Sequence, residues 1–300
     1  MRHMSTPRDH HFIPVFYLKK WAGPDGKFIE CRPYQVKFHI KRVGPRATGF
    51  ARDLYAFPDL PAELAQFLES KFLARTDELA ALVHTNLLAG DAAPWTPETR
   101  SAWSRFAINF LIRHPQPFAE IRAVAHDCWL KPDNITQQEY EKLKKPEDPP
   151  TFERWVLAQG NHLADQIRIR LIQGVLDNEL AGTRLNAMAW NVLDLSKSKF
   201  RLLTSDWPLY REINGDDILF ALPISPTALF TAVTRQATFQ KMQRDNPDLV
   251  VRHINTGVVS AARLYVYASD ESQERFVRNR MSSKMAIAPF FPSLANLHGQ

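Results

Sequence analysis

Hydrophobic residues recur at helical spacing through the middle of the chain. Between residues 64 and 87 the apolar positions form one stripe along a helix, and Gly90 follows them as an end signal. Thr96 and Pro97 supply an N-cap hydroxyl and a proline at the first helical position, which predict the start of a second helix. The same spacing continues beyond it. The four helices predicted in this way cover residues 60–89, 97–113, 117–130 and 151–180.

Shorter apolar runs at both ends of the chain predict strands. Near the N-terminus a Pro-Asp-Gly turn at residues 24–26 separates two such runs and predicts a hairpin, and a third run alternates apolar with basic residues. After Arg184, runs rich in β-branched and aromatic residues predict five more strands, and residues 249–263 fit a helix. The predicted strands cover residues 16–18, 28–31, 36–41, 188–193, 200–203, 218–222, 229–233 and 264–267.

Runs of helices followed by runs of strands predict an α+β fold with antiparallel pairing. In this arrangement the helical middle region packs on a mainly antiparallel sheet, which the N-terminal strands and the C-terminal third provide. We therefore expect a single domain over residues 8–300. Residues 131–150 differ from their surroundings because charge is dense there and prolines recur, which indicates an exposed loop or lid with room for one helical turn.

Positive charge is concentrated near the N-terminus. The 300-residue chain carries a formal charge of +6. The segment from Pro14 to Arg52 has nine basic and two acidic residues, so it alone carries +7. Such a segment favours contact with an anionic partner, for example nucleic acid, and Lys37, Lys41 and Arg42 are its candidate binding residues. The alternative is a set of solvated strand faces.

Several classes of protein are excluded by patterns that the sequence lacks. No apolar run is long enough for a membrane span and no secretory signal is present, so we expect a cytoplasmic protein without membrane contact. The phosphate-binding loop, the dinucleotide fingerprint and the zinc-binding helix motif are missing, which excludes the common nucleotide-dependent classes. Cys31 and Cys128 do not have the spacing of a metal site or a disulfide framework. No metal is predicted, and no cofactor is assigned.

Two polar motifs are candidate sites. In the first, the adjacent residues His10 and His11 precede an apolar segment, and the imidazole of one of them could act as an acid, a base or a ligand because it titrates near neutral pH. The alternative is a hydrogen-bonded histidine that anchors the chain end. In the second, Ser205 and Asp206 follow a predicted strand, whose rigid end can present a carboxylate to a substrate. Ordinary turn formation explains these two residues equally well.

An amide and a guanidinium lie beside the apolar face of the second helix. Asn109 and Arg113 are four positions apart and therefore lie on one side of that helix. A guanidinium against a core needs an anion. The anion for Arg113 is Glu69, Asp206 or a bound ligand.

Blocks of residues along most of the chain resemble the DUF4238 family, a widespread group known only as a domain of unknown function. The two most specific blocks are His-Phe-Ile-Pro at 11–14 and Thr-Ser-Asp-Trp-Pro at 204–208. The family usually has Asn between the Asp and the Pro, where this chain has Trp207. The resemblance brings no reaction, but it singles out His11, Arg113, Ser205 and Asp206. The other matching blocks are residues 16–19, 53–55, 106–113 and 222–225.

Two functions fit these observations. In the first, the chain is an enzyme that acts on a phosphate-containing or other anionic substrate, such as nucleic acid. His11 then acts as acid, base or ligand with Asp206 as its partner, while Arg113 holds the anion. Ser205 and Asn255 orient the substrate. In the second, the chain is a non-catalytic binding or regulatory module whose basic strands contact a partner.

The two functions differ in the geometry that they require. We predict that His11, Arg113 and Asp206 meet in space. Side chains at the floor of an open pocket would favour the enzyme. Buried side chains that bond one another would favour the module.

Overall fold

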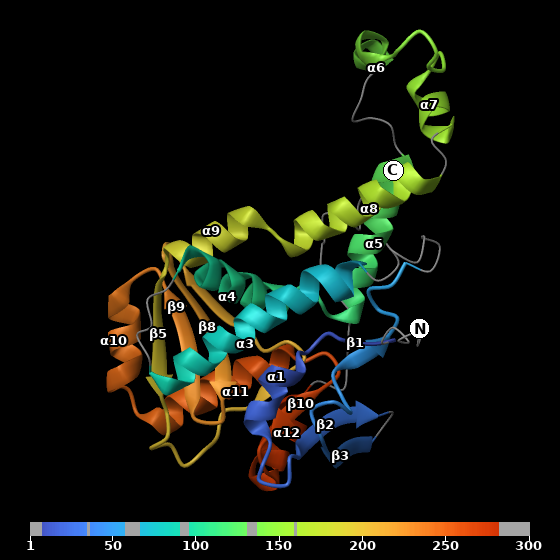
Figure 1. Cartoon of the computed structure of the whole chain (residues 1–300). Helices are drawn as coiled ribbons and strands as arrows, with labels where there is room; N and C mark the ends of the chain where they lie inside the picture. The colour runs from blue at the N-terminus through green and yellow to red at the C-terminus, as the bar shows by residue number, and fades with distance from the viewer. Residues whose placement is uncertain are drawn as a thin grey trace.

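The protein has an α+β fold, as predicted (Figure 1). The computed structural model describes residues 8–34, 37–57, 67–90, 96–130, 137–158 and 161–281. Within these ranges the strands form three antiparallel sheets. Helices from the middle of the chain and from the C-terminal third lie against the sheets.

One four-stranded sheet joins strands from the N-terminal part of the chain to strands from its C-terminal third. β2 (Phe28–Tyr34) pairs with β3 (Lys37–Val43) on one side and with β10 (Val266–Ala268) on the other. β10 then pairs with β6 (Thr204–Ser205). The basic N-terminal strands therefore share a sheet with strands of the C-terminal third.

The second four-stranded sheet comes entirely from the C-terminal third. α10 (Gln236–Arg244) and α11 (Pro247–Ala261) pack on one of its faces, where Phe239 and Ile254 join a buried cluster with Leu219. Most of the strand residues thus follow Arg184, as the apolar runs predict. In their order across the sheet, the strands are β5 (Ala189–Asp194), β9 (Ala228–Val233), β8 (Asp217–Ser225) and β7 (Tyr210–Asn214).

Helices of the middle region cover the other face of this sheet. α3 (Ala74–Ala89) packs on α4 (Pro97–Asn109), and both lie across the strands (Figure 1). Trp103 of α4 meets Phe230 of β9 edge to face, with ring centroids 5.5 Å apart. The largest buried apolar cluster therefore lies between these helices and the sheet.

The ends of the middle helices follow local sequence signals. α3 ends at Gly90, whose φ of 69° is the left-handed conformation that glycine adopts without strain. α4 begins with a capping box between Thr96 and Thr99. The other elements of this region are a π-helical segment η2 (Leu68–Leu73), α5 (Pro115–Leu130), α6 (Gln137–Leu143), α7 (Phe152–Ala158), α8 (Asn161–Leu176) and α9 (Glu179–Ala187).

The segment predicted as a loop or lid contains a helix. α6 occupies residues 137–143 and is largely exposed, whereas residues 131–136 lie outside the described ranges. α6 and α7 lie at the far end of α5 and α8, away from the sheets (Figure 1). Closure of this segment over a site stays a prediction. Among the described helices, each is too short or too polar to cross a bilayer.

The prediction that residues 16–18 form the first strand of an N-terminal hairpin is wrong. Residues 15–18 form the short helix α1 (Val15–Leu18), which continues as the 3₁₀ turn η1 (Lys19–Trp21). A helical turn places Tyr17, Leu18 and Trp21 together in the core, which an extended strand cannot do. The sequence analysis also missed β1 (Asp9–His11) and β4 (Phe50–Arg52), which pair with each other, and β7, which pairs with β8.

Several other predicted boundaries differ from the structure. The helix predicted over 151–180 corresponds to α7, α8 and α9. Asn178 accepts the backbone N–H of Ala181 and starts α9 as a new helix, whereas residues 159–160, between α7 and α8, lie outside the described residues. The helix over 97–113 ends at Asn109. The strand at 200–203 is irregular backbone, and the pairing begins at β6. The start of the first predicted helix, 60–66, lies outside the described residues.

Candidate functional site

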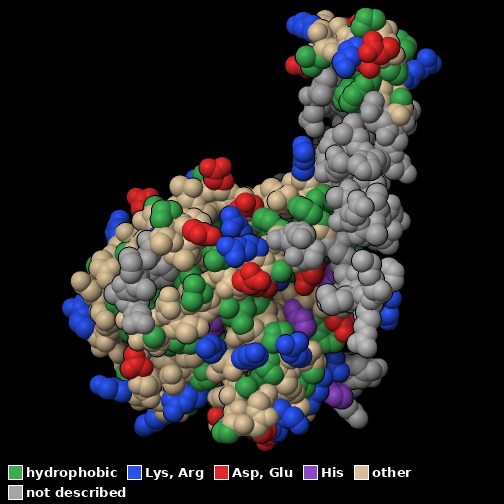
Figure 2. Space-filling view, viewed as in Figure 1, with side chains coloured by type: hydrophobic (Ala, Val, Ile, Leu, Met, Phe, Trp, Pro, Cys, Tyr) green, Lys and Arg blue, Asp and Glu red, His purple; other side chains and the backbone are tan. Residues whose placement is uncertain are grey.

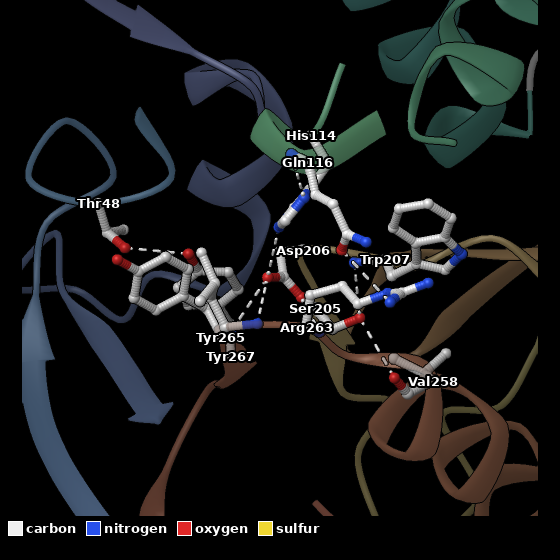
Figure 3. A network of polar contacts seen from close by, with 11 residues as sticks. Thr48, His114, Gln116, Ser205, Asp206, Trp207, Val258, Arg263, Tyr265 and Tyr267 are labelled. Atoms are coloured by element: carbon white, nitrogen blue, oxygen red, sulfur yellow. Dashed lines mark hydrogen bonds and ion pairs between the residues drawn. The ribbon is translucent and has the colours of Figure 1, made fainter. Parts of the chain in front are cut away.

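Asp206 occupies a cradle of backbone amides at the end of β6 (Figure 3). Its carboxylate accepts the N–H groups of Arg263, Leu264 and Tyr265 at 2.8, 2.5 and 3.2 Å. These amides belong to the segment between α11 and β10, so one side chain fixes the turn that brings the chain back into the sheet. The residue is only 1% exposed. The carboxylate is therefore closed to solvent and satisfied by the backbone.

His114 lies beside this carboxylate. Its Nε2 is 3.3 Å from Oδ2 of Asp206, outside hydrogen-bond geometry, and its Nδ1 accepts the backbone N–H of Gln116 at 3.3 Å. The imidazole is 4% exposed and packs edge-on against Phe12. Both ring nitrogens thus face protein groups. The sequence analysis missed His114, because its position before Pro115 indicates only a helix boundary.

Ser205 and Asn255 tie α11 to the sheet. Ser205 Oγ donates to the carbonyl oxygen of Val258 at 3.2 Å and accepts the N–H of Trp207 at 3.0 Å. Asn255 Oδ1 accepts the N–H of Leu203 at 2.9 Å, and its Nδ2 donates to Arg201 O and Gln273 Oε1. Both side chains are buried. Their polar atoms are used inside the protein.

The anion that meets Arg113 is Asp77 of α3. Nη1 and Nη2 of Arg113 donate to the two carboxylate oxygens of Asp77 at 2.7 and 3.0 Å, and Nη2 also donates to the carbonyl oxygen of His11 at 3.1 Å. Arg113 is 2% exposed. The pairing predicted with Glu69 or Asp206 is therefore replaced by a bidentate pair with Asp77. The packing of α3 on α4 determines this partner.

The surroundings of Arg113 shift the pKa values of two other groups. Burial raises the pKa of Glu69 to about 7; Arg113 opposes this shift and Asp77 adds to it. Burial lowers the pKa of His11; a hydrogen bond to the backbone of Arg46 opposes the shift, and the nearby charge of Arg113 adds to it. Within the described residues, His11 Nε2 and Glu69 Oε2 are buried without a hydrogen-bond partner. Two groups that can bind a proton, the carboxyl of Glu69 and the imidazole of His11, therefore lie near Arg113.

His11, Arg113 and Asp206, which were predicted to meet, belong to two separate groups of contacts in the structure. His11 contributes its carbonyl oxygen to Arg113, whereas Asp206 contacts His114 and the backbone. Arg113 and His114 are consecutive, and their side chains point to different partners. The two groups are therefore adjacent in the chain but bonded separately.

The remaining candidate binding residues lie apart from these two groups of contacts. Asn109 is fully buried, and neither of its amide atoms has a partner within the described residues. Lys41 pairs with Glu30 at 3.1 Å, and Arg42 pairs with Asp25 at 2.7 Å. The side chain of Lys37 lies outside the described part of the chain.

The comparisons with known proteins identify one family. The family model described as "Protein of unknown function (DUF4238)" matches residues 9–272. No curated protein and no solved structure matches the chain. The matched range runs from β1 past β10, so it includes the Asp206 cradle and the Arg113–Asp77 pair. The chain belongs to the DUF4238 family.

Proposed function

We propose that the chain is a non-catalytic module that binds an anionic partner, such as nucleic acid, through a basic surface beside α1. We define this basic surface by Lys19, Lys20, Lys27 and Arg46. Lys19 and Lys20 lie in η1, Lys27 directly precedes β2, and Arg46 follows β3. Because Phe28 pairs with Val43, Lys27 and Arg46 lie at the same end of the hairpin.

The main support for this proposal is the positive charge of these four residues, which is unpaired within the described part of the chain. Within the described residues no carboxylate lies within ion-pair distance of them, whereas Lys41 and Arg42 of β3 each have one. Lys and Arg side chains cross the surface over α1 and continue toward β1 and β2 (Figure 2). Uncompensated cations on one face attract a polyanion and release its counterions on binding.

The polar network favours a module over an enzyme. Ser205, Asp206 and Arg113 are buried, and their hydrogen bonds go to protein groups. A catalytic group must reach the reacting atoms, or reach them through one water. Of the predicted catalytic side chains, only His11 is partly exposed, so the enzyme alternative rests on that imidazole.

The test is binding of fluorescein-labelled single-stranded RNA and duplex DNA, followed by anisotropy at increasing salt. Replacing Lys19, Lys27 and Arg46 by Ser should weaken binding about tenfold or more and lower the salt slope by about 2–3, because each lost phosphate contact removes about 0.9 from it. The matched control replaces three exposed cations of the α10 region, Arg235, Lys241 and Arg244, by Ser.

The control variant should bind nearly as well as the wild type. Equal weakening by both triple variants would attribute binding to net charge and contradict a defined surface. Absence of binding at about 50 mM salt, where electrostatic contacts are strong, would also contradict the proposal. Cleavage of the labelled strands that His11→Ala abolishes would instead support the enzyme.

A further inference from the structure

A pocket beside Trp207 has no role in the network described above. Its volume is about 300 Å³, and it lies between the end of β6, β7 and α11. Leu209 and Val258, both buried, contribute apolar surface to it. Because a cavity of about 150 Å³ holds benzene, this volume suffices for a fused two-ring molecule.

One wall is the ring of Tyr210, which is fixed at its hydroxyl and along one side of the ring. Its hydroxyl donates to Glu212 at 3.1 Å and lies 2.8 Å from Nε2 of His253. Along one side the ring packs on the backbone of α11 at Gly257, where an added Cβ would lie 2.3 Å from Tyr210 Cδ2. This close approach requires glycine, so the ring is held in one position before any ligand arrives.

The second wall is the indole of Trp207. The guanidinium of Arg263 lies over this ring, 4.9 Å from the centroid, and His114 meets it edge-on at 6.0 Å (Figure 3). Arg263 is held in turn by Gln116, to which it donates at 3.4 Å. Trp207 therefore presents an aromatic face from a supported position. Fixed aromatic side chains bind a planar ring at low entropic cost.

The charge of the pocket selects among planar ligands. Arg211 of β7 is exposed at the pocket, and Arg263 lies behind Trp207. The described residues that line the pocket include no Asp or Glu. A guanidinium pairs with carboxylate or phosphate in a bidentate manner. The lining thus combines two aromatic walls, an apolar floor and a cation.

We propose that this pocket binds a planar aromatic anion, a fused ring that carries a carboxylate or a phosphate. The ring lies between Trp207 and Tyr210, and the anionic group pairs with Arg211. The proposal does not depend on the basic surface beside α1, because none of the residues of that surface lines the pocket. A failure of nucleic-acid binding would leave it unchanged.

The test is isothermal titration of the full chain with 2-naphthoate. The charge-reversed probe 2-naphthylmethylamine has the same ring system and should bind at least about fivefold more weakly, since it lacks the pairing with Arg211. 2-Naphthyl phosphate should bind at least as well as the carboxylate. Arg211→Gln should weaken naphthoate binding about fivefold or more and remove the preference for the anion.

Two further variants separate the aromatic contact from folding. Trp207→Phe keeps an aromatic face and should retain most of the affinity, whereas Trp207→Ala should lose about tenfold or more. Arg235→Gln, an exposed arginine in front of α10, is the matched control and should bind like the wild type. Equal affinity for the amine and the carboxylate would overturn the proposal, as would undiminished binding by Arg211→Gln or no binding by the wild type.

Discussion

A buried carboxylate is usually neutralised by a cationic side chain, but Asp206 is held by three backbone amides. Such amides stabilise an anion without a counter-charge, because their dipoles converge on it. The side chain thereby joins the start of β10 to the end of β6. The role of Asp206 in this arrangement is to fix the conformation of the backbone at residues 263–265.

Asp206→Asn should lower the free energy of unfolding by about 2–4 kcal/mol, because the new NH₂ group would face backbone donors. Urea denaturation measures this change. Asp194→Asn is the control: Asp194 is exposed and makes a local turn with Ser196, so a change within about 0.5 kcal/mol is expected. A similarly small effect at Asp206 would show that the carboxylate does not support the fold.

The pKa of Glu69 predicts a pH-dependent stability. Its folded-state pKa of about 7 lies above the ordinary 4.5, so the folded protein holds this proton more tightly than the unfolded chain. The contribution of Glu69 to stability is therefore present below about pH 4.5 and is lost as the pH rises through about 7.

Glu69→Gln should remove the loss of stability that accompanies a rise in pH, because the amide of glutamine does not titrate. The variant should gain stability relative to the wild type as the pH rises from about 4.5 to about 8, as measured by urea denaturation at several pH values. Glu78→Gln, on the exposed side of α3, should leave the pH profile unchanged. Parallel profiles for the wild type and Glu69→Gln would refute the shifted pKa.

At the residue scale, the sequence shows that a side chain requires an interaction, but it does not show which residue provides that interaction. That Arg113 requires an anion follows from its place beside an apolar face, and the structure confirms it. Which carboxylate meets it depends on how α3 rotates against α4, and a rotation by one residue exchanges the candidates. The amide cradle of Asp206 leaves no side-chain signal, because any residue can supply a backbone N–H.

At the element scale, strong local signals were reliable and weak ones were not. Thr96-Pro97 and Gly90 predicted helix ends correctly, because capping needs only neighbouring residues. The four residues of α1 are too few to show a helical period, so their apolar run predicts a strand instead. β6 and β10 contain two and three residues, so only tertiary pairing defines them.

Two helical glycines should respond in opposite ways to alanine. Gly257→Ala in α11 should destabilise by about 1–3 kcal/mol, because the new methyl group meets the Tyr210 ring. Gly182→Ala in α9 should stabilise by about 0.5–1 kcal/mol, because nothing lies within 4 Å of the added Cβ and alanine favours a helix. Thermal melts of the two variants check both signs. Stabilisation by Gly257→Ala would contradict the close packing of Tyr210 on α11.

At the scale of the whole molecule, the reactivity of Cys31 measures the stability of the sheet in which β2 pairs with β10. It lies on β2 opposite Ile40 and Val266 and is 1% exposed. Burial, with nearby acidic groups, raises the pKa of its thiol to about 12, so the native protein presents little reactive thiolate.

In a Cys128→Ser variant, a thiol reagent should therefore label Cys31 only through global unfolding. The free energy obtained from the labelling rate should equal that from urea denaturation. Much faster labelling would mean that β2 opens locally and that the sheet formed by β2 and β10 does not unfold together with the rest of the protein. Adding Val266→Ala, which weakens the contact between β2 and β10, should accelerate labelling.

The position of β10 also affects the chain during its synthesis. β2 and β3 leave the ribosome early, but the second edge of β2 finds its partner only when residues 266–268 emerge. At about 5–20 residues per second, that interval lasts on the order of ten seconds or more. An unpaired edge with apolar side chains such as Ile29 is a template for other strands. The nascent protein is therefore most exposed to mispairing and to chaperone capture until β10 arrives.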